Sequence, residues 1–191
     1  MAPDASRILP RVWEGVEYRP LDDLAPARDL FAFAAAAFPT VPDPTLALGA
    51  WAEGARLVGA VVAERAGTTA LLSGPVVASA RLEAPVANTR DANAPLEIAE
   101  QLVGAAVDHA TANGVETIFA RPQGLDRIWV RFGFIPVPEV ALPEALRGRP
   151  GAGLFAYRRG SALWSWRESI AEEDRGFSPA ARRRRSPRSS T

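Results

Sequence analysis

The stretch that decides the fold covers residues 95–137 and reads PLEIAEQLVGAAVDHATANGVETIFARPQGLDRIWVRFGFIPV. Its first half predicts a helix, because Asn93, Pro95 and Glu97 are residues that favour a helix start. Gly114 stands where a glycine commonly ends a helix. Five residues at helical spacing should form the buried face of this helix: Ala99, Leu102, Val103, Ala106 and Ala110.

The second half of the stretch predicts a strand, a short helix and another strand. Residues 115–120 have the composition of a fully buried strand, and apolar residues on one face favour a short helix over residues 125–132. Gly133 closes that helix, and residues 134–137 and 154–158 are expected to be the last two strands. The loop between these strands is rich in proline and glycine and has room for one helical turn.

Upstream of this stretch the pattern predicts a strand, a helix and three more strands. A short strand is expected over residues 16–19, and apolar residues at helical spacing over 22–38 favour a helix that the following prolines stop. Residues 46–51, 57–64 and 69–79 are rich in valine, leucine and alanine, with turn residues between them. They therefore predict an antiparallel meander.

The predicted order of elements indicates an α/β domain of the α+β type. Its sheet should be mixed but mostly antiparallel, and flanked by helices. The long helix joins the third meander strand to the strand over residues 115–120, so those two strands are expected to be parallel neighbours.

Two pieces of the sequence resemble the GCN5-related N-acetyltransferase (GNAT) superfamily. Residues 107–115, VDHATANGV, are similar to the end of that family's central helix. Residues 129–134, WVRFGF, resemble its short helix and the glycine-phenylalanine strand that follows. The resemblance covers residues 16–159 and agrees with the predicted order of elements. It implies a GNAT fold and an N-acyltransferase that uses acetyl-CoA or another acyl-CoA as co-substrate.

The resemblance also implies where an acyl-CoA binds. In this family the third meander strand and its parallel neighbour splay apart, and the pantetheine arm pairs with the exposed edge like an added strand. The pyrophosphate binds at the N-terminus of the following helix, where free N–H groups and the helix dipole favour anions. Carried onto this sequence, the cofactor-binding candidates are Pro75, Val76, Val77, Ala78, Asn93, Ala94, Leu96 and Gln123.

Three features depart from the family's pattern. The loop before the helix, residues 92–99, has no glycine, while Pro95 removes an N–H donor and Glu97 adds a negative charge near the phosphates. Trp129 stands where the family commonly has a tyrosine that protonates the leaving thiolate. The usual asparagine ahead of that helix is missing, and Gln123 is the nearest polar residue. These departures favour an alternative function, a catalytically degenerate GNAT-fold protein that acts as a binding or assembly subunit.

Two residues are candidates for a catalytic group, Glu64 at the end of a meander strand and Tyr157 on a later strand. For both, a structural role is the favoured interpretation: a surface carboxylate beside a turn, and a packed tyrosine. His109 is interpreted as a solvated or packing side chain rather than a catalytic one. Arg147 and Arg149 lie beside the expected cleft and could hold phosphates or an acidic substrate, although solvated loop arginines are commoner. The catalytic residues are left open.

The composition excludes several kinds of site. The chain has no cysteine and a single histidine, so disulfides, thiolate ligands, a cysteine nucleophile and histidine-rich metal sites are excluded, and no metal is expected. All 22 basic residues are arginine. Genomic bias is the favoured explanation, and avoidance of amines that acyl thioesters would acylate is the alternative. No apolar run approaches the ~20 residues needed to cross a bilayer and no signal peptide is visible, so a cytoplasmic protein is expected.

We expect three parts in the chain: a flexible arm over residues 1–15, a GNAT-like domain over 16–160, and a tail over 161–191. The expected partner-binding residues of the tail are Trp164, Trp166, Arg182, Arg183, Arg184 and Arg185. The tryptophans predict docking, on a protein partner or on the parent domain. The arginines could bind nucleic acid or an anionic surface, but a solvated terminus is commoner.

Overall fold

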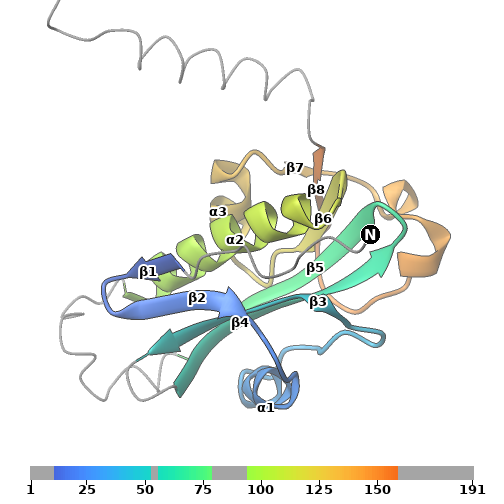
Figure 1. Cartoon of the computed structure of the whole chain (residues 1–191). Coiled ribbons are helices and arrows are strands. Elements are labelled where there is room, and N and C mark those ends of the chain that lie inside the picture. The colour runs from blue at the N-terminus through green and yellow to red at the C-terminus, as the bar shows by residue number, and fades with distance from the viewer. Residues whose placement is uncertain (1–10, 53–55, 79–93, 159–191) are drawn as a thin grey trace, which may run out of the picture. The chain divides into compact units, whose positions relative to one another are not determined.

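The computed structural model describes residues 11–52, 56–78 and 94–158, which form one mixed sheet with helices on both faces (Figure 1). The described residues contain eight strands in the order β1-β2-β3-β4-β5-β6-β8-β7. The strands are β1 Arg11–Trp13, β2 Val16–Pro20, β3 Asp43–Ala52, β4 Arg56–Ala66, β5 Thr69–Val77, β6 Thr117–Arg121, β7 Ile135–Pro136 and β8 Phe155–Arg158. The helices are α1 Ala25–Phe33, α2 Ala94–Ala112 and α3 Asp126–Arg131, with short 3-10 turns η3 Glu139–Ala141 and η4 Glu144–Leu146.

The strands β5 and β6 are parallel neighbours, whereas the other neighbouring strands of the sheet pair antiparallel. The parallel ladder runs from Thr69 opposite Thr117 to Ser73 opposite Arg121. The chain between these strands contains α2, in line with the long crossover that a parallel pair requires. The predicted fold class, a mixed and mostly antiparallel sheet flanked by helices, is confirmed.

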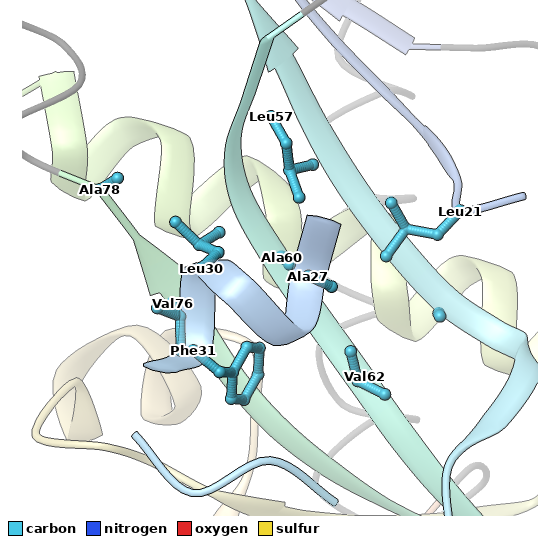
Figure 2. Packing of buried hydrophobic residues seen from close by; sticks show 10 residues of the cluster. Leu21, Ala27, Leu30, Phe31, Leu57, Ala60, Val62, Val76 and Ala78 are labelled. Carbon is cyan, nitrogen blue, oxygen red and sulfur yellow. The ribbon is translucent and has the colours of Figure 1, made fainter. Parts of the chain in front are cut away.

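The two faces of the sheet are covered by different helices. α1 lies on one face, and α2, with α3 beside it, lies on the other (Figure 1). Ala60 on β4 belongs to the cluster under α1, together with Phe31 and Val76 (Figure 2). Its neighbour Gly59 faces the other way, since a Cβ placed there would lie 3.5 Å from Cγ2 of Ile98 on α2. Alternate residues of β4 therefore pack against opposite helices, as the twofold repeat of a strand requires.

α2 packs on the sheet through a buried face of alanine and aliphatic residues. Its predicted buried face is buried as expected: Ala99, Leu102, Val103, Ala106 and Ala110. Burial of Leu102 and Val103 stabilises the fold by about 1.5–3 kcal/mol each. Gly114 follows the helix with a φ of 79°, a left-handed conformation that glycine adopts without strain. The prediction for this helix and its stop is confirmed.

α1 ends at Phe33, so the prediction of a helix as far as residue 38 is wrong. The chain closes the helix with an N–H bond from Ala36 to the carbonyl of Phe31 at 2.9 Å, and Ala35 has a φ of 51°. Phe38 still packs on the cluster under α1, with its ring 5.3 Å from that of Phe31 in an edge-on arrangement. The apolar spacing thus reflects the packing of the connector to β3 and not a continued helix.

The predicted N-terminal arm contains a strand. β1 pairs antiparallel with β2, and Trp13 lies opposite Val16. The two residues between them, Glu14 and Gly15, have φ values of 47° and 80°, as the tightest hairpin turns require. The sequence pattern missed this strand because three residues show no alternation. The rest of the arm, residues 1–10, lies outside the described part of the chain.

The loop between β7 and β8 contains η3 and η4, where the sequence indicated one helical turn. None of the helices in the described ranges is long and apolar enough to span a bilayer.

Candidate functional site: a slot between β5 and β6

β5 and β6 separate after Ser73 and Arg121. These residues are the last pair of the parallel ladder, but β5 continues along β4 to Val77. β6 ends at Arg121, and the chain then turns through Gln123 and Gly124, whose φ values are 50° and 81°. Within the described residues, the edge of β5 beyond Ser73 therefore has no strand partner on the β6 side.

A β-bulge in β5 marks the point of separation. Between the pairs Val62–Ser73 and Ala60–Val76, β5 has one residue more than β4. Gly74 lies in this bulge with a φ of 110°, and a Cβ there would be 2.9 Å from the carbonyl oxygen of Ala60. A side chain would clash with backbone at this position, so the bulge requires glycine.

A cavity of about 320 Å³ lies along this free edge of β5, and we call it the slot. It is lined by Ala34 and Ala36 after α1, Pro75, Val76 and Val77 on β5, Pro95, Leu96 and Ala99 on α2, and Gln123 and Leu125 before α3. Because α1 and α2 lie on opposite faces of the sheet, the slot crosses the sheet from one face to the other.

The backbone of Val77 presents polar groups to the slot. The N–H of Ala78 donates to the carbonyl of Val58 on β4 at 2.9 Å. Backbone groups alternate in direction along a strand, so the N–H and C=O of Val77 point away from β4. Pro75 also lines the slot but carries no N–H. A ligand with amide groups that lies along this edge can therefore bond to the N–H and C=O of Val77.

The N-terminus of α2 opens beside the slot, since Leu96 and Ala99 of its first turns form part of the wall. The first N–H groups of a helix have no intrahelical acceptor and carry a partial positive charge. Pro95 contributes no N–H, and Glu97 places an exposed negative charge in the first turn. This helix end therefore favours an anion less than a glycine-rich helix start would.

A second cavity of about 490 Å³ lies between α2 and α3. It shares Leu96 and Leu125 with the slot, so the two cavities are neighbours. Its charged wall residues are two arginines and two acids: Arg127, Arg131, Glu100 and Asp126. The formal charges of this wall cancel, and Arg131 is already paired with Glu100 at 2.9 Å.

Solved structures of acyltransferases are similar to this chain in fold. An acetyltransferase from Streptococcus agalactiae is 14% identical, with a TM-score of 0.53 over 76% of this chain and 99% of its own. A putative acyl-CoA N-acyltransferase from Klebsiella pneumoniae is 12% identical, with a TM-score of 0.50 over 75% of this chain and 95% of its own. N-acetylglutamate synthase from Neisseria gonorrhoeae, solved with coenzyme A and N-acetylglutamate, is 16% identical, with a TM-score of 0.53. That match covers 76% of this chain and 35% of the synthase, so this chain spans about a third of the synthase's length.

This chain has the fold of the GCN5-related N-acetyltransferases. No family model matches its sequence, and no curated protein does. The likeness therefore concerns the GNAT fold and not the chemistry of this chain's site.

The GNAT fold brings most of the predicted cofactor-binding residues to the slot: Pro75, Val76, Val77, Leu96 and Gln123. Ala78 is not on the slot wall, because its side chain is buried and its N–H is bound to Val58. Ala94 is the first residue of α2, and Asn93 lies outside the described residues. The role of these residues in binding an acyl-CoA stays a prediction.

The connector between α1 and β3 contributes to the slot, which the sequence did not predict. Ala34 and Ala36 line the slot, whereas the sequence placed them inside a helix. Alanine carries no polar group that would single it out as a binding residue. The positive φ of Ala35, which ends the helix early, is unusual for alanine and has no signal in the sequence.

Glu64 is a buried carboxylate that does not line the slot. Its Oε1 accepts the N–H groups of Thr40 at 2.7 Å and Val41 at 3.0 Å, and its Oε2 is paired with Arg149. The prediction of a surface carboxylate beside a turn is therefore wrong, because two loops cover this side chain. Three N–H donors occupy its oxygens, which makes Glu64 a structural residue rather than a base.

Trp129 and Tyr157 both pack around Phe134 in the core. The ring of Trp129 is fully buried and lies edge-on to that of Phe134, with 4.8 Å between the centroids. Its Nε1 has no hydrogen-bond partner among the described residues. The ring of Tyr157 lies 5.4 Å from that of Phe134. Neither side chain is on the slot wall, so the interpretation of Tyr157 as a packed tyrosine agrees with its position.

The remaining polar candidates also have structural contacts. His109 is buried, and its Nε2 lies 2.7 Å from the carbonyl oxygen of Thr45, so the packing interpretation holds. Arg147 donates from Nε to the carbonyl of Leu142 at 2.8 Å. Arg149 is paired with Glu64, so the prediction of a solvated loop arginine is wrong for this residue.

Within the described residues, the wall of the slot contains no ionisable side chain. The same part of the chain contains no group of three or more metal-ligating residues that could hold an ion. The predicted partner-binding residues lie outside the described ranges: Trp164, Trp166, Arg182, Arg183, Arg184 and Arg185. What the described slot offers is an uncharged channel, in which apolar side chains alternate with polar groups such as the backbone of Val77 and the amide of Gln123.

Proposed function

We propose that this protein binds an acyl-CoA in the slot and transfers its acyl group to an amine. The observation that carries the proposal is the free edge of β5 beyond Ser73, which borders a cavity that crosses the sheet beside the N-terminus of α2. The likeness in fold to a synthase solved with coenzyme A supports it.

On this proposal, Val77 binds the pantetheine arm through its backbone. Its N–H donates to a pantetheine carbonyl and its C=O accepts a pantetheine N–H, as in the addition of a strand to a sheet edge. A hydrogen bond of this kind contributes about 0.5–1.5 kcal/mol net. Most of the binding free energy must therefore come from apolar contact with Pro75, Ala99 and Leu125 on the slot wall.

The N-terminus of α2 is the proposed neighbour of the phosphates. Its dipole and free N–H groups attract an anion, while the missing donor at Pro95 and the charge of Glu97 oppose it. The cancelled charges of the second cavity add no net attraction for a nucleotide. We therefore expect an acyl-CoA to bind more weakly here than at a glycine-rich helix start.

The slot's contribution to chemistry is positioning and the exclusion of water. The acyl-CoA would supply an activated thioester, and the slot walls would hold its carbonyl close to the amine. Good orientation can supply about 7–11 kcal/mol of the barrier by itself. No acid or base lines the described slot, so a proton released from the amine would leave through water.

Thermal and chemical unfolding with acetyl-CoA tests the proposal. A ligand at a hundred times its Kd raises the free energy of unfolding by about 2.7 kcal/mol. We expect stabilisation by acetyl-CoA and by coenzyme A, and less by adenosine 3′,5′-bisphosphate, which lacks the pantetheine arm. An unchanged free energy of unfolding at millimolar acetyl-CoA would contradict the proposal.

A second candidate function is a GNAT-fold subunit that has lost catalysis and binds a protein partner through residues 161–191. It is supported by the packing of Trp129, which has no group able to protonate a thiolate, and by the absence of ionisable side chains on the described slot wall. This function predicts that no amine is acylated even where acetyl-CoA binds. Deletion of residues 161–191 should then abolish co-purification of a specific partner from the native cell.

A further inference from the structure

The wall of the slot on the α1 side is apolar and uncharged. Residues 34–42, which connect α1 to β3, read AAAAFPTVP and contain no charged side chain. Ala34 and Ala36 of this connector line the slot. Phe33 at the end of α1 and Val41 of the connector are 59% and 66% exposed, so large apolar side chains reach solvent on this side of the sheet.

The buried carboxylate that touches this connector has its charge balanced by an arginine. Glu64 accepts N–H groups from Thr40 and Val41 and is paired with Arg149. Its side chain is 3% exposed and is not on the slot wall. Glu64 therefore offers no attraction to a cation inside the slot.

The carboxylates of α2 are also directed elsewhere. Glu97 is exposed and does not line the slot, and Glu100 lines the second cavity, where it is paired with Arg131 at 2.9 Å. Across the described ranges, the slot thus has neither a carboxylate to attract an ammonium group nor a base to deprotonate one.

This arrangement disfavours a strongly basic amine as the acyl acceptor. An alkylamine with a pKa near that of lysine, about 10.4, is a cation at pH 7. Such an amine either loses its proton before it enters, and only about one molecule in 2,500 is neutral at pH 7, or it enters as a cation that finds no carboxylate on the described wall of the slot. An apolar amine that is already uncharged at pH 7 avoids both obstacles.

We propose that the acyl acceptor is an apolar, weakly basic amine of the arylamine class, which enters the slot from the α1 side. This inference rests on the proposed acyl-CoA function. In the transfer, the amine nitrogen bonds to the thioester carbonyl carbon, the carbon–sulfur bond breaks, and one proton passes from nitrogen to the leaving thiolate through water. No protein base has to act before the attack.

A matched pair of amines tests this inference with the full chain. Aniline and cyclohexylamine have rings of the same size but differ widely in basicity. With acetyl-CoA at pH 7, and after subtraction of the rate without protein, we expect thiol release with aniline to be at least about tenfold faster. With cyclohexylamine, the rate should rise about tenfold per pH unit between pH 7 and 9, because its neutral fraction rises by that factor.

A pair of variants tests the part played by charge. Ala36→Asp places a carboxylate on the α1 side of the slot, and Ala36→Asn places a neutral group of the same size there. We expect the ratio of aniline to cyclohexylamine rates to fall in Ala36→Asp and to stay as in the parent in Ala36→Asn. The ratio compares two substrates on one preparation, so it is independent of a partial loss of folded protein.

The outcomes separate this inference from the proposed function. Equal or faster release with cyclohexylamine at pH 7 would overturn the arylamine acceptor while leaving acyl transfer intact. Stabilisation by acetyl-CoA without acylation of either amine would overturn it as well. If acetyl-CoA gives no stabilisation, the proposed function has failed and the acceptor fails with it.

Discussion

Glu64 on β4 forms a partly buried ion pair with Arg149, which lies 85 residues further along the chain. The two side chains are 3% and 25% exposed. The same carboxylate accepts the N–H groups of Thr40 and Val41. One side chain thus attaches two loops, one of which contributes Ala34 and Ala36 to the slot, to the middle of the sheet.

Removal of this carboxylate should destabilise the fold. We expect Glu64→Ala to lower the free energy of unfolding by about 3 kcal/mol or more, because it leaves a partly buried guanidinium unpaired and two N–H groups without an acceptor. Glu64→Gln keeps an acceptor oxygen and should lose about half as much. Urea denaturation measures both. Arg147→Ala is the control, because this exposed arginine bonds to loop carbonyls and not to Glu64. Equal losses of stability in all three variants would contradict the structural role assigned to Glu64.

The N–H of Val77 should contribute to ligand binding but not to the stability of the fold. Val77→Pro removes this N–H, which points away from β4, so no bond of that ladder is lost. We expect it to weaken acetyl-CoA binding about three- to tenfold, which corresponds to one hydrogen bond. Val77→Ala keeps the N–H and should bind nearly as the parent does. Calorimetry on both folded variants measures this, and unchanged affinity in Val77→Pro would mean that the ligand does not lie along β5.

The charge of Glu97 should weaken the binding of phosphates. An exposed negative charge repels a nearby anion by up to about 1 kcal/mol. We therefore expect Glu97→Gln to bind acetyl-CoA about two- to fivefold more tightly at low salt, with a smaller gain at high salt. Glu116→Gln, at an exposed position after α2, is the matched control. Identical affinities for the two variants would place the phosphates elsewhere.

The bulge at Gly74 should tolerate no side chain. Gly74→Ala combines a positive φ with a contact of 2.9 Å to the carbonyl oxygen of Ala60, so we expect a loss of at least about 2 kcal/mol. Gly124 also has a positive φ, 81°, but open space around its Cα. Gly124→Ala should therefore lose about 1 kcal/mol. If thermal unfolding gives the same loss of stability for Gly74→Ala and Gly124→Ala, the contact with the Ala60 carbonyl does not exclude a side chain at Gly74.

Tyr18 should make stability fall at alkaline pH. Burial, with smaller contributions from the charges of Glu97 and Glu14, raises the pKa of its hydroxyl well above the ordinary value of 10.0. The unfolded chain therefore loses this proton first, and stability decreases as pH rises above about 10, by up to about 1.4 kcal/mol per unit. The chain has no lysine and no cysteine, so few other groups titrate in this range.

Tyr18→Phe tests this dependence. The hydroxyl has no hydrogen-bond partner among the described residues, so its removal should be neutral or stabilising at pH 7. We expect a flatter profile of the free energy of unfolding between pH 9 and 11 than in the parent. A slope equal to that of the parent would assign the alkaline loss to another group.

The regular elements of this fold carry periodic signals, which is why the sequence predicts them. β3, β4 and β5 are runs of valine, leucine and alanine with turns between them, and α2 repeats its small residues at helical spacing. The end of α1 was not predictable in this way, because Phe38 keeps the helical spacing and packs beside Phe31 from outside the helix.

The candidate site was predictable only in part. Resemblance to a family placed Val77 and Leu96 at the slot, but nothing local to the sequence marks a strand edge that loses its neighbour after Ser73. The burial of Glu64 depends on Thr40, 24 residues before it, and on Arg149, far after it. Contacts over such separations are set by the register of the whole sheet. Local sequence patterns therefore do not predict them.

The slot has walls from both faces of the sheet, with Ala34 and Ala36 on one side and Leu96 and Ala99 on the other. Two molecules that approach from opposite faces do not compete for one entrance, so both can be present together. On the proposed function, we then expect the reaction to pass through a ternary complex. Double-reciprocal plots for the two substrates should intersect rather than run parallel.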